Sequence, residues 1–273
     1  MSLALTPARR RTAAAVLTAA LLVPLAACGN DDKKDSGSDS GTKSSGSAAP
    51  KANLTVLAAA SLTDVFATAG AAYEKENPGT KVNFSFAGSQ ELAAQVNQGS
   101  PADALVTADT KTMDGLKSDT GTPSVIAKNR LVIAVGEGNP KKVAELKDLS
   151  DSKLKVVLAA PEVPVGRYSE QILDEQKIDV KPVSQEPNVR AVLSKVELGE
   201  ADAGLVYKTD AATATATEKV DAIKIPDSEN AIAEYPAATL KSSKHAKASA
   251  AFVKWLSTPA AQKILKDAGF EKP

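Results

Sequence analysis

The sequence predicts an α/β fold built around a parallel sheet. From residue 53 to the C-terminus, short apolar runs of strand length alternate with segments whose apolar residues recur at helical spacing. Strands and helices that alternate in this way are typical of parallel sheets covered by helices. The chain has 273 residues, which is enough for one large or two medium domains.

The first 27 residues have the pattern of a secretory signal peptide. Three arginines at residues 9–11 precede an apolar stretch over 12–27, which is short for a stable membrane span. The stretch ends in Ala26-Ala27-Cys28-Gly29, which resembles the lipobox of bacterial lipoproteins, where the cysteine is lipidated and becomes the mature N-terminus. We therefore expect a lipoprotein signal peptide over 1–27 and a lipid on Cys28. An uncleaved anchor with an incidental cysteine is the alternative.

A polar segment over 28–52 separates this region from the alternating pattern. It consists mainly of Asp, Lys, Ser and Gly and has too few apolar residues to offset the entropy of ordering the chain. We expect a flexible lipid-anchored linker. The folded part would then work at the outer face of the cytoplasmic membrane, on the periplasmic side if the cell has an outer membrane.

The elements follow in order along the folded part. Strands are expected at 54–57, 81–86, 104–107, 131–135, 153–160, 203–207, 220–225 and 234–240. The first helix should bury one apolar face, made by Leu62, Val65, Phe66, Ala69 and Tyr73. Further helices should bury Leu92, Ala93 and Val96; Ile172 and Leu173; Val189, Val192, Leu193 and Val196; Ala248, Phe252, Trp255 and Leu256; and Ile264 and Leu265. Gly199 is expected to end one helix, and Thr258-Pro259 to begin the last.

Charge and composition exclude several classes of function. The chain has 33 basic and 33 acidic residues, and removing residues 1–27, with three arginines and no acid, leaves 30 against 33. A net charge of −3 gives no bulk attraction for nucleic acid or an anionic membrane. One cysteine and one histidine, His245, cannot make a Cys/His zinc site. No phosphate loop or Asp-rich calcium loop occurs either.

Four helix starts present small residues and free backbone N–H groups. They lie at Ser61, Ser89, Val165-Gly166 and Val189, and a strand end adds the phenol of Tyr207. Ser61 is expected to be the N-cap of the first helix, with Asp64 near its positive end. Each helix N-terminus carries roughly half a positive charge, so four aimed at one point would suit a small dianion. Hydroxyl and N–H donors would satisfy a fully deprotonated oxyanion without a basic side chain.

Seven motifs follow one another from residue 53 onward: Ala58-Ala59-Ala60-Ser61-Leu62-Thr63, Phe86-Ala87-Gly88-Ser89, Gly99-Ser100-Pro101-Ala102-Asp103, Pro161-Glu162-Val163-Pro164-Val165-Gly166-Arg167-Tyr168, Val189-Arg190, Gly204-Leu205-Val206-Tyr207 and Ala268-Gly269-Phe270. Their order and spacing resemble those of the molybdate-binding proteins of bacterial ABC transporters, which are type II periplasmic-type substrate-binding proteins. In that family, two serine hydroxyls, two backbone amides and a tyrosine hydroxyl bind the oxyanion. The resemblance places these donors at Ser61, Ser89, Val165, Val189 and Tyr207.

The resemblance also implies an architecture. The fold would have two α/β lobes, lobe 1 at 53–132 plus 234–273 and lobe 2 at 133–233, joined by crossover strands near 131–135 and 234–238. The ligand would bind in the cleft between the lobes and close them. Two positions depart from the family pattern: Gly88 stands where relatives often have serine and could loosen its loop, and Asn188 stands where they often have an acid. Arg167 and Arg190 are expected to act through lobe packing or helix stability.

The function implied is a monomeric receptor that captures molybdate or tungstate and delivers it to the permease of an ABC importer. It would not be an enzyme and would need no cofactor and no cation. One alternative is a receptor for another tetrahedral oxyanion such as sulfate. A serine hydrolase using Ser61 is a second, although the Gly-x-Ser-x-Gly motif is absent and the only histidine lies in a polar run near the C-terminal helices. A protein that kept the fold and lost the ligand is a third.

Overall fold

The structure is a computed structural model that describes residues 51–213 and 216–273. All of these residues belong to one unit, which spans Ser47–Pro273. The predicted signal peptide, Cys28 and nearly all of the predicted linker lie outside the described residues. Among the residues that the structure does describe, no helix combines the length and apolar character needed to cross a bilayer.

The first lobe is built on three parallel strands: β1 (Ala52–Ala59), β2 (Thr80–Ala87) and β3 (Ala104–Val106), in the order β2-β1-β3. A short 3-10 turn, η1 (Ala60–Leu62), leads from β1 into helix α1 (Thr63–Glu76). Helices α2 (Ser89–Asn97) and α3 (Thr110–Asp114) follow the next two strands, and the C-terminal helices α7 (Ala246–Trp255) and α8 (Pro259–Asp267) return to this lobe. Thr258 caps α8 through its side chain, as predicted.

The second lobe repeats the same layout on β5 (Val156–Ala159), β6 (Ser184–Glu186) and β7 (Ala203–Tyr207), which are parallel to one another. Its helices are α4 (Pro164–Glu175), α5 (Val189–Glu197) and α6 (Lys208–Ala211), and β8 (Val220–Lys224) lies at its side. Short 3-10 turns complete it: η2 (Leu146–Ser150), η3 (Ala216–Glu218) and η4 (Asp227–Glu229). Helix α5 ends before Gly199, whose φ of 69° favours glycine, as the sequence predicted.

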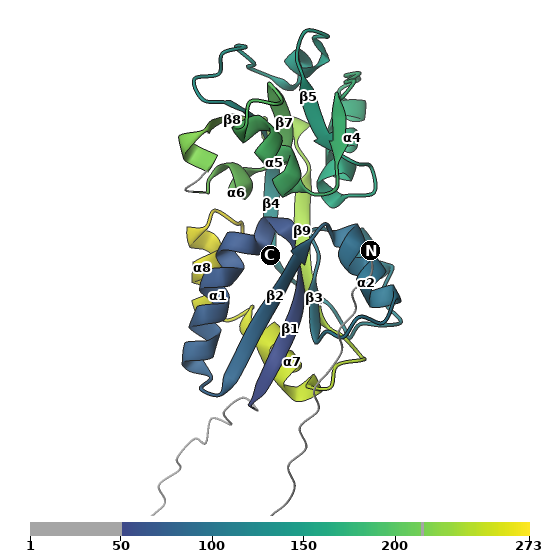
Figure 1. Cartoon of the computed structure of the whole chain (residues 1–273), viewed down its shortest axis with the longest axis vertical. Coiled ribbons are helices and arrows are strands. Elements are labelled where there is room, and N and C mark those ends of the chain that lie inside the picture. The colour runs from purple at the N-terminus through teal and green to yellow at the C-terminus, as the bar shows by residue number, and fades with distance from the viewer. Residues whose placement is uncertain (1–50, 214–215) are drawn as a thin grey trace, which may run out of the picture. The chain divides into compact units, whose positions relative to one another are not determined.

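Two long strands, β4 (Ser124–Gly136) and β9 (Ile232–Thr239), run between the lobes (Figure 1). β9 pairs with β3, and residues 124–130 of β4 pair with β9; from Leu131 onward β4 pairs with β7 and β8. All of these pairings are antiparallel, so the expectation of a parallel sheet was wrong: the sheet is mixed. Alternation of strands and helices predicts parallel neighbours within each lobe but carries no information about strands that leave one lobe for the other.

The core confirms the predicted face of α1, whereas Ala93 and Val96 of α2 and Ile264 of α8 are only partly buried. Leu62, Val65, Phe66, Ala69 and Tyr73 are all buried at the start or along one side of α1. The Tyr73 ring packs edge-on against Phe252 and Trp255 of α7, with ring centroids 5.1 and 5.3 Å apart. Such aromatic contacts stabilise beyond the apolar area that they bury. They attach the C-terminal half of α1 to α7.

Candidate functional site

One small cavity lies where the two lobes meet. Its volume is about 10 Å³, comparable with the smallest cavities that hold a water molecule. The lining residues are Ala59, Ala60, Ser61, Ala87, Gly88, Ser89, Ala108, Val163, Pro164, Val165, Asn188, Val189 and Tyr207. All five residues that the sequence predicts as ligand donors are among them, and none of the lining residues is charged. The first lobe contributes the two serines, and the second lobe contributes both valines and the tyrosine.

Ser61 lies inside the 3-10 turn η1 and does not cap α1. The expectation of an N-cap was wrong, because the turn inserts before the helix and Leu62 occupies the cap position. The Ser61 hydroxyl instead lies 2.9 Å from the hydroxyl of Tyr235 on β9. Asp64 does lie in the first turn of α1, as expected. Because the Ser61 side chain does not cap the helix, it forms part of the cavity wall.

Ser89 is the first residue of α2 and is almost fully buried. Its Oγ accepts a hydrogen bond from the backbone N–H of Ala108 at 3.0 Å. Because a backbone N–H can only donate, the serine oxygen is the acceptor there, and its own proton remains for another partner. Glu91 accepts from the N–H of Gly88 at 3.0 Å and closes the start of the helix.

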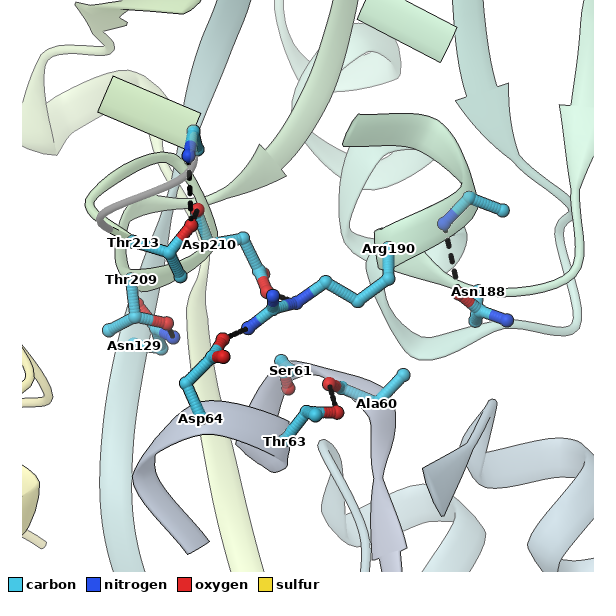
Figure 2. A network of polar contacts seen from close by, with 12 residues as sticks. Ala60, Ser61, Thr63, Asp64, Asn129, Asn188, Arg190, Thr209, Asp210 and Thr213 are labelled. Atoms are coloured by element: carbon cyan, nitrogen blue, oxygen red, sulfur yellow. Dashed lines mark hydrogen bonds and ion pairs between the residues drawn. The ribbon is translucent and has the colours of Figure 1, made fainter. Parts of the chain in front are cut away.

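The two valines are buried at the starts of α4 and α5. Val165 is the second residue of its helix and Val189 the first, so neither backbone N–H has an acceptor within its helix. The Asn188 side chain caps α5 by accepting from the N–H of Ala191 at 3.0 Å (Figure 2). Both helices thus begin at the cavity, where their N-termini present free N–H groups and the positive end of the helix dipole.

Tyr207 is the last residue of β7, and its side chain is 1% exposed. Its hydroxyl is buried and has no hydrogen-bond partner within the described residues. The ring packs against that of Tyr235, with centroids 5.9 Å apart. Burial raises the pKa of the Tyr207 hydroxyl well above its ordinary value, so the group stays protonated and can donate. A buried hydroxyl without a partner costs about 1–3 kcal/mol, which a ligand in this cavity would recover.

Arg167 and Arg190 do not line the cavity but connect the lobes beside it. Arg167 of α4 pairs with Asp109 and donates to the Thr112 hydroxyl at 2.9 Å, and both partners belong to the first lobe. Arg190 of α5 reaches Asp64 of α1 at 2.6 Å and Asp210 of its own lobe at 2.6 Å (Figure 2). The two arginines therefore hold the lobes together.

Asp210 is fully buried beneath Arg190, and its second carboxylate oxygen has no hydrogen-bond partner within the described residues. Burial raises the pKa of Asp210 from 3.8 to about 6, although the Arg190 charge opposes the shift. Between about pH 4 and about pH 6, Asp210 is therefore protonated in the folded protein but ionised in the unfolded chain. This contributes stability that is present below about pH 4 and is lost as the pH rises through about 6.

We expect Asp210→Asn to remove this pH dependence. The free energy of unfolding of the wild type, minus that of the variant, should fall by roughly 2–3 kcal/mol between about pH 4 and about pH 7. Urea unfolding at both pH values measures the difference, and the other carboxyl groups cancel because they are common to both proteins. A difference that does not change with pH would contradict the raised pKa.

Three polar residues near the cavity escaped the sequence analysis. Tyr235 and Asn129, both almost fully buried, lie on β9 and β4, and Asp210 lies within α6, the short helix that follows Tyr207. Tyr235 fell within a predicted strand and received no role. The available signal was a phenol and an amide next to apolar strand residues, since buried polar groups need partners. Within residues 51–213 and 216–273, no group of three or more His, Cys, Asp or Glu side chains could hold a metal ion.

Comparison with known proteins connects this geometry to a family. Residues 54–271 match the family described as bacterial extracellular solute-binding proteins. The chain belongs to this family. The solute-binding protein described here is thus extracytoplasmic, as the N-terminal pattern led us to expect.

Two curated relatives are similar over most of this solute-binding protein. The molybdate-binding protein ModA of Mycobacterium tuberculosis is 38% identical over 263 residues, which cover 94% of this chain and 97% of the relative. The putative ABC transporter substrate-binding lipoprotein YvgL of Bacillus subtilis is 32% identical over 240 residues, covering 85% and 91%. Both relatives are named for binding a substrate and neither for catalysis.

A solved structure confirms the two-lobed type II fold. The periplasmic molybdate-binding protein of Azotobacter vinelandii superposes with a TM-score of 0.68 at 20% identity, covering 81% of this chain and 99% of the other. The two-lobed architecture with crossover strands that the sequence motifs implied is the one observed.

Proposed function

We propose that this protein binds molybdate or tungstate outside the cytoplasm and delivers it to the permease of an ABC importer. The observation that carries the proposal is the Tyr207 hydroxyl, which is buried without a hydrogen-bond partner among the described residues, in a cavity that no charged side chain lines. The name of the relative at 38% identity supports the choice of molybdate. The anion is cargo and not a cofactor, and no cation is required.

The ligand set comprises the hydroxyls of Ser61, Ser89 and Tyr207 and the backbone N–H groups of Val165 and Val189. These are neutral donors, so they suit an oxyanion that carries no proton. Hydrogen phosphate is disfavoured, because its proton needs an acceptor that this set does not offer. Helix N-termini supply partial positive charge without the desolvation of a lysine or arginine.

In this proposal the ligand joins the lobes. We place lobe 1 at 53–132 plus 234–273 and lobe 2 at 133–233, because the parallel strands β1–β3 belong to one range and β5–β7 to the other, and only β4 and β9 pair with strands of both lobes or link them within the described residues. The serines belong to lobe 1 and the other donors to lobe 2, so bound anion stabilises the closed arrangement. Closure is the signal that the permease would read, and a single chain supplies the whole site.

The lipid on Cys28 and the cleavage of 1–27 belong to the same proposal. The motif before Cys28 supports them, as does the description of the Bacillus subtilis relative as a lipoprotein. Metabolic labelling with a radioactive fatty acid tests the anchor. We expect label on the wild type but not on Cys28→Ser. Equal labelling of both proteins would exclude a lipid on Cys28.

A hydrolase using Ser61 has no support in the geometry. The Ser61 hydroxyl bonds to Tyr235, whereas the ring of His245 lies 3.2 Å from Asp103. A serine nucleophile needs a base within hydrogen-bond reach, and none of the contacts of Ser61 supplies one. We therefore propose a binding protein without catalytic activity.

Isothermal calorimetry of the full chain with molybdate, tungstate, sulfate and phosphate tests the function. We expect tight binding of molybdate and tungstate with one anion per chain, and much weaker binding of phosphate. Tight sulfate binding without molybdate binding would reassign the ligand within the same class. No binding of any of the four anions, and no change in melting temperature with them, would refute the receptor function.

Tyr207→Phe is expected to weaken molybdate binding by about 1–3 kcal/mol, because it removes one donor and little else. Tyr73→Phe is the matched control: its hydroxyl is also buried without a partner within the described residues, but it does not line the cavity. Calorimetry should show a loss only for the first variant. Equal molybdate affinities for wild type and Tyr207→Phe would show that the Tyr207 hydroxyl does not bind the anion.

Gly88→Ala is expected to hinder closure. A Cβ at Gly88 would lie 2.5 Å from the backbone oxygen of Pro187 in the other lobe, where Gln90 also donates to that oxygen at 2.8 Å. Glycine is thus required for contact between the lobes, and the expectation that it loosens its loop finds no support. Molybdate affinity should fall at least tenfold, which corresponds to about 1.4 kcal/mol. Gly136→Ala, where a Cβ meets nothing within 4 Å, is the control.

A further inference from the structure

Behind the cavity wall, Ser61 belongs to a chain of buried polar groups. Its hydroxyl lies 2.9 Å from that of Tyr235, and either oxygen could be the donor by distance alone. Both side chains are almost fully buried, at 3% and 0% exposure, so water does not compete for the protons. The direction of this one hydrogen bond decides whether Ser61 presents a proton or a lone pair to the cavity.

Asn129 determines the direction. Its Oδ1 accepts from the backbone N–H of Arg130 at 3.0 Å, and because that N–H can only donate, the orientation of the amide is fixed. The Nδ2 group then donates to the Thr209 hydroxyl at 2.8 Å and, over a longer 3.4 Å, to the Tyr235 hydroxyl. A phenol oxygen that accepts from Asn129 directs its own proton to Ser61.

Burial strengthens this assignment. It raises the pKa of Tyr235 far above the ordinary value, so the phenol always carries its proton. The ring is held between those of Tyr207 and Phe270, at centroid distances of 5.9 and 5.4 Å, which fixes the position of the hydroxyl. Tyr235 does not line the cavity itself, so its hydroxyl acts on a ligand through Ser61.

We propose that Tyr235 and Asn129 are positioning residues that direct the hydroxyl proton of Ser61 into the oxyanion cavity. The Ala108 N–H has the corresponding role for Ser89 at the start of α2, so each serine oxygen accepts from a group behind it and directs its own proton forward. The inference rests on the proposed oxyanion function and adds the cause of its selectivity. A serine hydroxyl whose proton could turn away from the cavity would present a lone pair there. It could then accept a hydrogen bond from a protonated ligand such as hydrogen phosphate.

The test is a double-mutant cycle between Tyr235→Phe and Ser61→Ala, with molybdate as the ligand and calorimetry as the readout. Tyr235→Phe alone should weaken binding roughly fivefold to tenfold, as expected for the loss of one oriented hydrogen bond. In the Ser61→Ala background the same change should have almost no effect, because the phenol acts through the serine. Tyr235→Phe should also let phosphate displace molybdate at lower concentration, which a purely structural role would not produce.

Asn129→Leu is a second variant, which removes the amide donor and leaves the phenol in place. It should shift the affinities for molybdate and phosphate in the same directions by a smaller factor. Thermal melting of every variant without ligand verifies folding, and Tyr73→Phe serves again as the control. Losses that add in the double variant, or unchanged selectivity in both Tyr235→Phe and Asn129→Leu, would overturn the proposal. A wild type that binds none of the oxyanions would instead refute the receptor function itself.

Discussion

Gly166→Ala is expected to abolish tight oxyanion binding and to destabilise the protein by about 3 kcal/mol or more. A Cβ at Gly166 would lie 2.0 Å from the carbonyl oxygen of Ala160 and 2.7 Å from that of Ala159. Both are backbone atoms at the end of β5, so no side-chain rotation can relieve the clash. The start of α4 would have to move away and take the N–H of Val165 out of the cavity.

Calorimetry with molybdate and urea unfolding measure the two effects of Gly166→Ala. Gly115→Ala is a suitable control, because a Cβ there approaches no atom closer than 3.4 Å and φ is −63°. The control should keep the wild-type affinity and change stability by less than about 1 kcal/mol. Wild-type affinity in Gly166→Ala would show that the position of the α4 N-terminus does not matter for binding.

Arg190→Met is expected to lower the free energy of unfolding by about 3 kcal/mol at neutral pH. The variant leaves the fully buried Asp210 without its cation, and uptake of a proton by Asp210 limits the loss. Affinity for the anion should fall as well, because the ion pair between Arg190 and Asp64 joins the lobes. Urea unfolding and calorimetry report the two consequences separately.

Two further variants make this prediction sharper. Arg130→Met breaks ion pairs with the more exposed Glu271 and Asp227 and should cost less than about 1 kcal/mol. Adding Asp210→Asn to Arg190→Met should restore much of the stability but not the affinity, since the contact with Asp64 stays lost. Full recovery of affinity in the double variant would show that Arg190 acts only within its own lobe.

The parts of the site that local sequence could predict are the helix starts. Small residues after an apolar strand, followed by helical periodicity, located Ser89, Val165 and Val189 at the beginnings of α2, α4 and α5. That these helices all begin at one cavity does not follow from local pattern, since it depends on how the lobes meet. The family resemblance, and not the periodicity, brought these positions together with Ser61 and Tyr207 as a set.

The failures have a common physical cause, which is contact between residues distant in sequence. The first half of β4 was missed because Lys128, Asn129 and Arg130 break its apolar character, and their partners lie more than 70 residues away. Ser61 matched the signal of an N-cap, but its hydroxyl is taken by Tyr235, which is 174 positions further along the chain. Local propensity cannot anticipate such competition.

Diffraction from crystals of the full chain grown with molybdate, recorded at the molybdenum absorption edge, tests the central claim most directly. We expect one anomalous peak per chain, in the cavity between Ser61, Ser89 and Tyr207, with oxygens about 2.7–3.1 Å from these hydroxyls and from the N–H groups of Val165 and Val189. A lysine or arginine in direct contact with the anion, or a peak elsewhere with this cavity empty, would contradict recognition by neutral donors.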